Sequence, residues 1–146
     1  MAYVVVDQLY DTCAPKLWTV ATDYNLLSEL MTGLVRFDGL PSEPMMEGQR
    51  LDIEVSLLGL LPKKPYRIDV IECEPEMMIM RTRENGHGIA MWDHTTAIVK
   101  NGEGARWIDV IEIEAGWLTW PATIWAKVIY TTRHRRRRRM LRRQGL

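Results

Sequence analysis

Apolar and polar residues alternate along much of the chain between Leu51 and Ala115. The clearest example is Leu51–Leu57, where leucine, isoleucine and valine occupy every second position and aspartate, glutamate and serine lie between them. Alternation with a period of two predicts a strand that buries one face. Related patterns, bounded by turn residues, predict further strands at Tyr3–Leu9, Leu34–Asp38, Tyr66–Glu74, Met77–Arg83, Ile89–Lys100 and Ala105–Ala115.

Three segments have helical patterns instead. Ala14-Pro15 opens a first short helix, for which Thr12 is the expected cap. A second short helix covers Asn25–Met31 and ends at Gly33. A long helix is predicted from Trp120 to about Arg143, and its inward stripe is expected to consist of Ala122, Trp125, Ile129, Arg133, Arg136 and Met140. Strands that lead into one closing helix indicate an α+β fold with a hollow between sheet and helix.

The strands Ile89–Lys100 and Ala105–Ala115 are expected to form a hairpin, because Asn101-Gly102 is a strong signal for a two-residue turn. The less charged face of this hairpin should face inward. A two-residue turn at that point places His94 opposite Asp109. A loop two residues longer shifts the partners but keeps both residues on the same face, since side chains alternate with a period of two.

His94 and Asp109 form the sharpest candidate pair for chemistry. A carboxylate beside an imidazole orients the ring and fixes its tautomer, which suits acid–base catalysis or the binding of a ligand's carbonyl or hydroxyl group. A buried polar pair that only fixes the strand register is the alternative. Both interpretations remain open at the level of sequence.

The length of 146 residues suits a single domain spanning 1–146, and 47% of the residues are hydrophobic. No apolar run approaches the roughly 18 residues of a membrane span. The segment Met1–Leu9 lacks the basic region of a secretory signal, and Cys13 and Cys73 are expected to be free thiols. These features favour a cytoplasmic protein, as a monomer or a homodimer.

No cofactor and no metal are expected. The histidines His87, His94 and His134 lie on different predicted elements, and no pair of them has the helical spacing of metal ligands.

The charge is unevenly spread, although the formal net charge is zero. Residues 133–143 hold eight arginines and no acid; removing these from 19 basic residues leaves 11 against 19 acidic ones, about −8 for the remainder. We expect a solvated helix end in which Arg133 and Arg136 reach Glu112 or Glu114. Contact with an anionic membrane surface or a partner protein is the alternative; specific nucleic-acid binding is not expected, because the run has no interleaved aromatic residues.

Four segments occur together in an order typical of one superfamily: Ala14-Pro15 with Leu17-Trp18, Met91–His94, Ile108–Ile111, and Tyr130–Leu141, which contains Arg133-His134. The chain resembles the START-like helix-grip superfamily, also called SRPBCC or polyketide cyclase/dehydratase-like, and a bacterial subgroup of it. The resemblance implies a curved antiparallel sheet of about seven strands around a long C-terminal helix, with an apolar cavity between them. That subgroup often has a second histidine at the position of Thr96, so a role needing paired histidines is not expected here.

The expected function is the binding of a small hydrophobic or amphipathic ligand, such as a lipid, an isoprenoid or an aromatic polyketide. The residues expected to line the cavity are Tyr66, Thr82, Trp92, His94, Thr96, Trp107, Asp109, Trp125 and Ile129. Two alternatives remain: a cyclase or dehydratase in which His94 and Asp109 shuttle a proton, and an interaction protein that acts through the basic helix.

Overall fold

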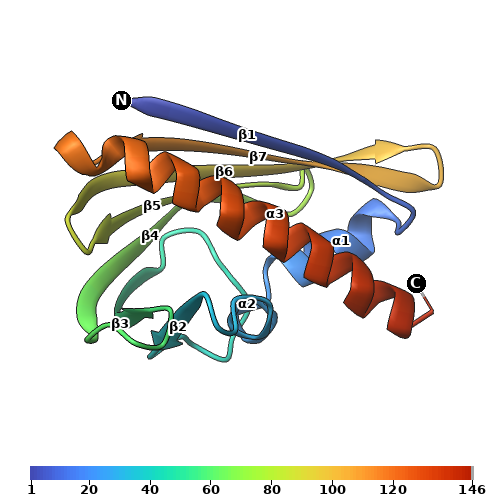
Figure 1. Cartoon of the computed structure of the whole chain (residues 1–146). Helices are drawn as coiled ribbons and strands as arrows, with labels where there is room; N and C mark the ends of the chain where they lie inside the picture. Colours follow the sequence, from blue (N-terminus) through green and yellow to red (C-terminus); the bar gives the residue numbers. More distant parts are fainter. Residues whose placement is uncertain (146) are drawn as a thin grey trace.

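The computed structural model describes residues 1–145, and it confirms the predicted α+β fold (Figure 1). In chain order its elements are β1 (Ala2–Tyr10), α1 (Ala14–Ala21), α2 (Tyr24–Leu30), β2 (Val35–Asp38), β3 (Arg50–Leu57), β4 (Lys64–Glu74), β5 (Ile79–Gly86), β6 (Ile89–Asn101), β7 (Gly104–Glu114), a short 3-10 helix η1 (Gly116–Leu118) and α3 (Thr119–Arg143).

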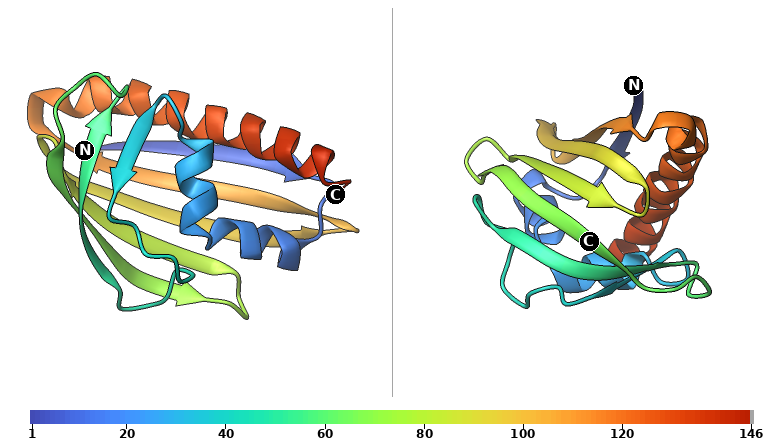
Figure 2. Two further views of the ribbon diagram at one scale, coloured as in Figure 1. Left: turned by 90° about the horizontal axis from the view of Figure 1, so that it is seen from below. Right: turned by 90° about the vertical axis from the view of Figure 1, so that its left-hand side faces the viewer.

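The seven strands form one open antiparallel sheet in the order β1-β7-β6-β5-β4-β3-β2. Figure 2 shows the sheet curving around α3, which lies along its concave side, while α1 and α2 connect the two edge strands. No helix within residues 1–145 is long and apolar enough to cross a membrane.

The core lies on the concave side and has two parts. One surrounds Trp92, Ile111 and Ile113 beneath the first half of α3. The other surrounds Leu17 and Trp107 near the helix end. Along β7 every second residue is buried on the concave side and the residues between are more exposed, so the period of two in the sequence reports which face is buried.

Capping explains how the short helices begin. The carboxylate of Asp23 accepts hydrogen bonds from the backbone N–H groups of Asn25 and Leu26, which fixes the start of α2. The expected cap of α1 was wrong, because Cys13 rather than Thr12 precedes that helix and makes no side-chain capping bond.

The register of the β6–β7 hairpin differs from the one expected for a two-residue turn at Asn101-Gly102. The turn residues are Gly102 and Glu103, Asn101 pairs with Gly104, and His94 lies opposite Ile111 rather than Asp109. Gly102 has φ +62°, and a positive φ at the first turn residue alone is typical of a type II′ turn. The strand partners are therefore shifted as the longer-loop alternative expected, although the turn itself still has two residues, and His94 and Asp109 still share the concave face.

The predicted inward stripe of α3 was displaced by about one residue. Ile129 is buried as expected, but Ala122, Trp125, Arg133, Arg136 and Met140 are only partly buried. The buried residues of the helix are Ala126, Ile129, Tyr130, His134, Arg137 and Leu141. Polar groups on the sheet bind the side chains of His134 and Arg137, which a search for apolar spacing does not anticipate.

Candidate functional site

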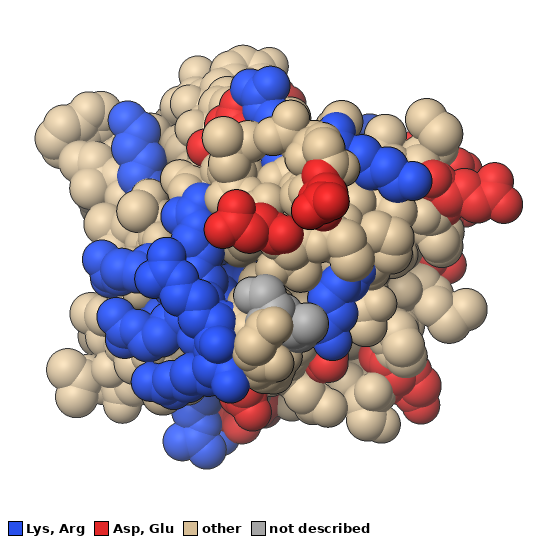
Figure 3. All heavy atoms as spheres, turned by 90° about the vertical axis from the view of Figure 1, so that its right-hand side faces the viewer, with Lys and Arg blue, Asp and Glu red and all other residues tan. Residues whose placement is uncertain are grey.

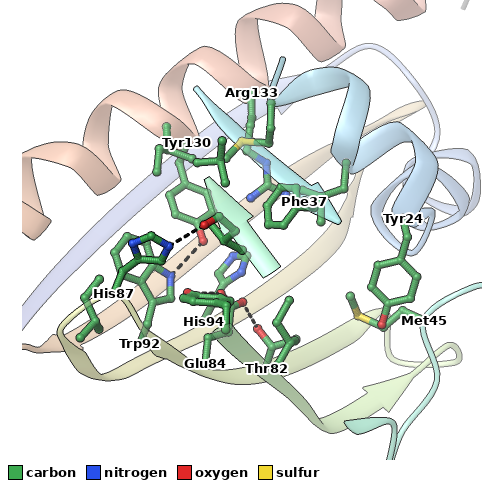
Figure 4. A pocket seen from close by; sticks show the side chains of 18 of the residues that line it. Tyr24, Phe37, Met45, Thr82, Glu84, His87, Trp92, His94, Tyr130 and Arg133 are labelled. Atoms are coloured by element: carbon green, nitrogen blue, oxygen red, sulfur yellow. Dashed lines mark hydrogen bonds between the residues drawn. The ribbon is translucent and has the colours of Figure 1, made fainter. Parts of the chain in front are cut away.

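A cavity of about 150 Å³ lies between the concave face of the sheet, α2 and α3 (Figure 4). Its lining comes from α2, α3 and the strands β2 to β6, and most of the lining side chains are apolar or aromatic. Six of the nine residues predicted to contact a ligand line it: Tyr66, Thr82, Trp92, His94, Trp125 and Ile129.

The other three predicted residues, Thr96, Trp107 and Asp109, do not line the cavity. The rings of His94 and Tyr130, whose centroids are 4.7 Å apart, belong to the lining. Asp109 is bonded to the Nε2 atom of His94 and is only 3% exposed. Thr96, Trp107 and Asp109 therefore lie behind the cavity wall and do not contact the space inside it.

Four donors converge on the carboxylate of Asp109. Its Oδ1 atom accepts from Nε2 of His94 at 2.8 Å, from Oγ1 of Thr96 at 2.8 Å and from Nε1 of Trp107 at 3.1 Å. Its Oδ2 atom accepts from Nε2 of His134 at 2.8 Å. A carboxylate that accepts only is ionised, so both imidazoles carry a proton on Nε2.

His134 joins this group from α3, and sequence reasoning missed it. Its Nδ1 atom accepts from the hydroxyl of Tyr10 at 2.6 Å and from Nη1 of Arg137 at 3.1 Å. Arg137 is itself only 3% exposed, and its guanidinium lies 3.9 Å from the ring centre of Trp107. The available signal for its burial was the helical spacing of three and four residues that joins Tyr130, His134, Arg137 and Leu141. The surrounding arginines made this spacing difficult to recognise.

Paired histidines are therefore present, although Thr96 occupies the position where the subgroup often has the second one. His94 on β6 and His134 on α3 bind opposite oxygens of one carboxylate. Within residues 1–145 no group of three or more His, Cys, Asp and Glu side chains has an arrangement that would hold a metal ion.

The close approach of β1 to the hairpin helps to place Tyr10. A Cβ atom on Gly104 would lie 2.1 Å from the carbonyl oxygen of Tyr10, so only glycine fits where the last residue of β1 meets β7.

Burial and hydrogen bonding set the charges of this network. Burial opposes ionisation of Asp109, but the hydrogen bonds from His134 and His94 outweigh it and hold the pKa of that carboxyl well below its usual range. Burial lowers the pKa of His134, and the nearby Arg137 cation lowers it further against the opposing effect of Asp109. His134 is therefore neutral at pH 7, in agreement with its hydrogen-bond pattern.

Comparisons with known proteins bear on the fold. No protein-family model matches the chain, and no curated protein matches it. Protein CV1439 from Chromobacterium violaceum has a TM-score of 0.76 at 11% identity, with 94% of this chain and 95% of that chain covered. Ara h 8.0201 has a TM-score of 0.67 at 7% identity, over 90% and 94% of the two chains. This chain has the helix-grip fold.

A third similar structure is DynU16, a protein from the dynemicin biosynthetic locus, with a TM-score of 0.61 at 14% identity over 91% of this chain and 46% of that one. Identities this low show the fold alone. Membership of the START-like superfamily, and of a bacterial subgroup of it, stays a prediction.

A second polar cluster lines the cavity of the helix-grip domain on its β5 side. The carboxylate of Glu84 accepts from the hydroxyl of Tyr66 at 2.8 Å and from Oγ1 of Thr82 at 3.0 Å. On the adjacent strand β6, where Trp92 pairs with Glu84, Nε1 of Trp92 donates to the hydroxyl of Tyr130 on α3 at 3.3 Å. Glu84 was not predicted, because its strand was expected to end at Arg83.

The arginine run separates into buried and exposed members. Arg136 donates to the carbonyls of Leu30 and Thr32 at the end of α2, instead of reaching Glu112 or Glu114. The expected bridges do not form because those glutamates lie on the outer face of the sheet, whereas α3 lies on the concave face.

The exposed arginines gather at the C-terminal end of α3, where they form a basic patch (Figure 3). This patch consists of Arg135, Arg139, Arg142 and Arg143. A contact between this patch and an anionic membrane surface or a partner protein stays a prediction.

Replacing His134 with glutamine is expected to flatten the pH dependence of stability. The pKa of His134 in the folded protein lies below its ordinary value of 6.5, so below that pH the unfolded chain takes up a proton that the folded protein does not. The wild type therefore loses stability as the pH falls through this range. Glutamine keeps an N–H for Asp109 but cannot titrate. Urea denaturation from about pH 7.5 to about pH 5 measures the difference, and an unchanged slope would contradict the prediction.

Proposed function

We propose that this helix-grip domain binds a small amphipathic molecule with a ring-sized apolar body in the cavity between the sheet and α3. The observation that carries the proposal is the cavity of about 150 Å³, lined mostly by aromatic and aliphatic side chains, with His94 in its wall. Concave, mostly apolar cavities with a few placed polar groups are typical of ligand sites.

The volume narrows the class of ligand. An engineered apolar cavity of roughly 150 Å³ in another protein accepts benzene, whereas sites for drug-sized ligands span roughly 300–1,000 Å³. One ring with short substituents therefore fits this cavity, while a lipid chain or a polycyclic polyketide would require the walls to move. The origin of DynU16 in a biosynthetic locus supports a small-molecule ligand.

His94 is placed to bind the polar end of such a ligand. Its Nε2 proton is bonded to Asp109, and its Nδ1 atom has no hydrogen-bond partner among residues 1–145. In the neutral imidazole Nδ1 is then an acceptor. A ligand hydroxyl that enters the cavity would donate to it.

The binding of toluene and of benzyl alcohol, followed by NMR titration, tests this function. We expect both compounds to bind the wild type. The variant His94→Leu has no acceptor and adds no ring to the cavity, so it should weaken benzyl alcohol by roughly threefold to tenfold, the effect of one neutral hydrogen bond, and leave toluene unchanged. Failure of both compounds to bind the wild type would refute the proposal.

Proton transfer by His94 is the second candidate function, in a reaction of the cyclase or dehydratase type. The observation that favours it is the orientation of the imidazole, because an ionised carboxylate holds Nε2 and leaves Nδ1 as a base. The variant His94→Gln separates the two functions, because its amide oxygen can still accept from a ligand hydroxyl but cannot take up a proton. General acid–base groups contribute roughly 10²–10⁴ in rate, so an enzyme would lose far more on His94→Gln than a binding protein loses in affinity.

A further inference from the structure

Arg133 differs from the other inward-facing arginines of α3 because its guanidinium has no hydrogen-bond acceptor among the residues that the structure describes. Its side chain lines the cavity, and its guanidinium carbon lies 4.9 Å from the ring centre of Tyr130. Its Nε atom is buried without a hydrogen-bond partner, and among residues 1–145 no carboxylate forms a salt bridge with it.

The neighbouring arginines show that this is specific to Arg133. Arg136 and Arg138 donate to backbone carbonyls, and Arg137 donates to Tyr10. The Nε atom of Arg137 is also without a partner, but that guanidinium is stacked on Trp107 inside the network of Asp109. A buried N–H donor without an acceptor is unfavourable, so a group that supplies an acceptor for Nε of Arg133 is favoured at this point.

Resting on the proposed binding function, we infer that Arg133 binds the carboxylate of the ligand, which is therefore a ring-sized organic acid. The planar fork of a guanidinium matches the two oxygens of a carboxylate. Figure 4 shows Arg133 entering from the α3 side and Glu84 lying on the sheet side.

This placement of charges also orients the acid. Glu84 is an acceptor that repels a second carboxylate, so the acid group lies toward α3. A hydroxyl substituent at the other end of the ring would donate to Glu84, which already accepts from Tyr66 and Thr82.

Benzoate and benzamide are matched probes, because they have nearly the same size and differ in charge at about pH 7. NMR titration of the wild type should show benzoate binding roughly tenfold or more tightly than benzamide, as expected for a charge-assisted hydrogen bond. The variant Arg133→Met should abolish this preference and leave benzamide affinity unchanged. The control Arg135→Met removes an exposed arginine of the same helix, and it should retain the wild-type preference.

The outcomes separate the inference from the function on which it rests. Binding of toluene and benzamide without any preference for benzoate would refute the role of Arg133 and leave the binding function standing. An equal loss of benzoate affinity in Arg133→Met and Arg135→Met would also refute it, because a long-range effect of charge would then explain the preference. Failure of every ring compound to bind the wild type would refute the binding function itself.

Discussion

Replacing Asp109 with asparagine is expected to lower the free energy of unfolding by about 3–5 kcal/mol, the range found when one partner of a buried charged group is removed. The carboxylate accepts from His94, Thr96, Trp107 and His134. An asparagine presents an NH₂ group to some of these donors, and the buried cation of Arg137 loses the negative charge that accompanies it.

Urea denaturation of the variant and the wild type at about pH 7 measures this effect. The matched control is Asp7→Asn, which removes a carboxylate paired with Arg106 on the neighbouring strands, where both side chains are solvent-exposed. Its denaturation midpoint should stay close to that of the wild type, because water replaces the lost partner. A midpoint for Asp109→Asn equal to that of the control would contradict the assignment of a buried ionised carboxylate.

The variant Val55→Phe is expected to abolish the binding of benzyl alcohol and of benzoate. Val55 lines the cavity from β3, and a phenyl group in its place would occupy the space that a ring-sized ligand needs. Overpacking of this kind destabilises a protein by about 1–3 kcal/mol, so the variant should still fold.

Ile111→Val is the control for lost stability, because Ile111 is fully buried but does not line the cavity. It should lose about 0.5–1.5 kcal/mol and bind both compounds as the wild type does. NMR titration of the two variants provides the comparison. Retention of binding by Val55→Phe would place the ligand elsewhere in the molecule.

The strands were predictable because one face of the sheet excludes water along its whole length. Leu51–Leu57 was expected and Arg50–Leu57 is observed, since alternation is a local property that the tertiary structure preserves. The hairpin register was not fixed in the same way. Turns at Asn101-Gly102 and at Gly102-Glu103 both keep Asp109 on the concave face, and only the observed pairing distinguishes them.

Part of the polar network around Asp109 could not be predicted from local sequence patterns. His94 and Asp109 were found because they lie on one inward face of two adjacent strands. His134 and Arg137 lie in the arginine run, and so many charged residues predict a segment exposed to solvent. The burial of these two side chains depends on Asp109 and Tyr10, which are distant in sequence. Arg133, by contrast, was placed on the inward stripe and does line the cavity, as do Trp125 and Ile129 of the same stripe.

The hydrogen bond from Nη2 of Arg138 to the carbonyl of Leu9, at 2.7 Å, has a consequence for self-association. β1 is the outermost strand on its side of the sheet, and unpaired backbone groups of such strands are templates for pairing with another chain. A charged side chain within the same molecule occupies one of these acceptors, so strand addition from a second chain would have to displace it. Arg138 thereby occupies one of the acceptors through which a second chain could add to this edge of the sheet.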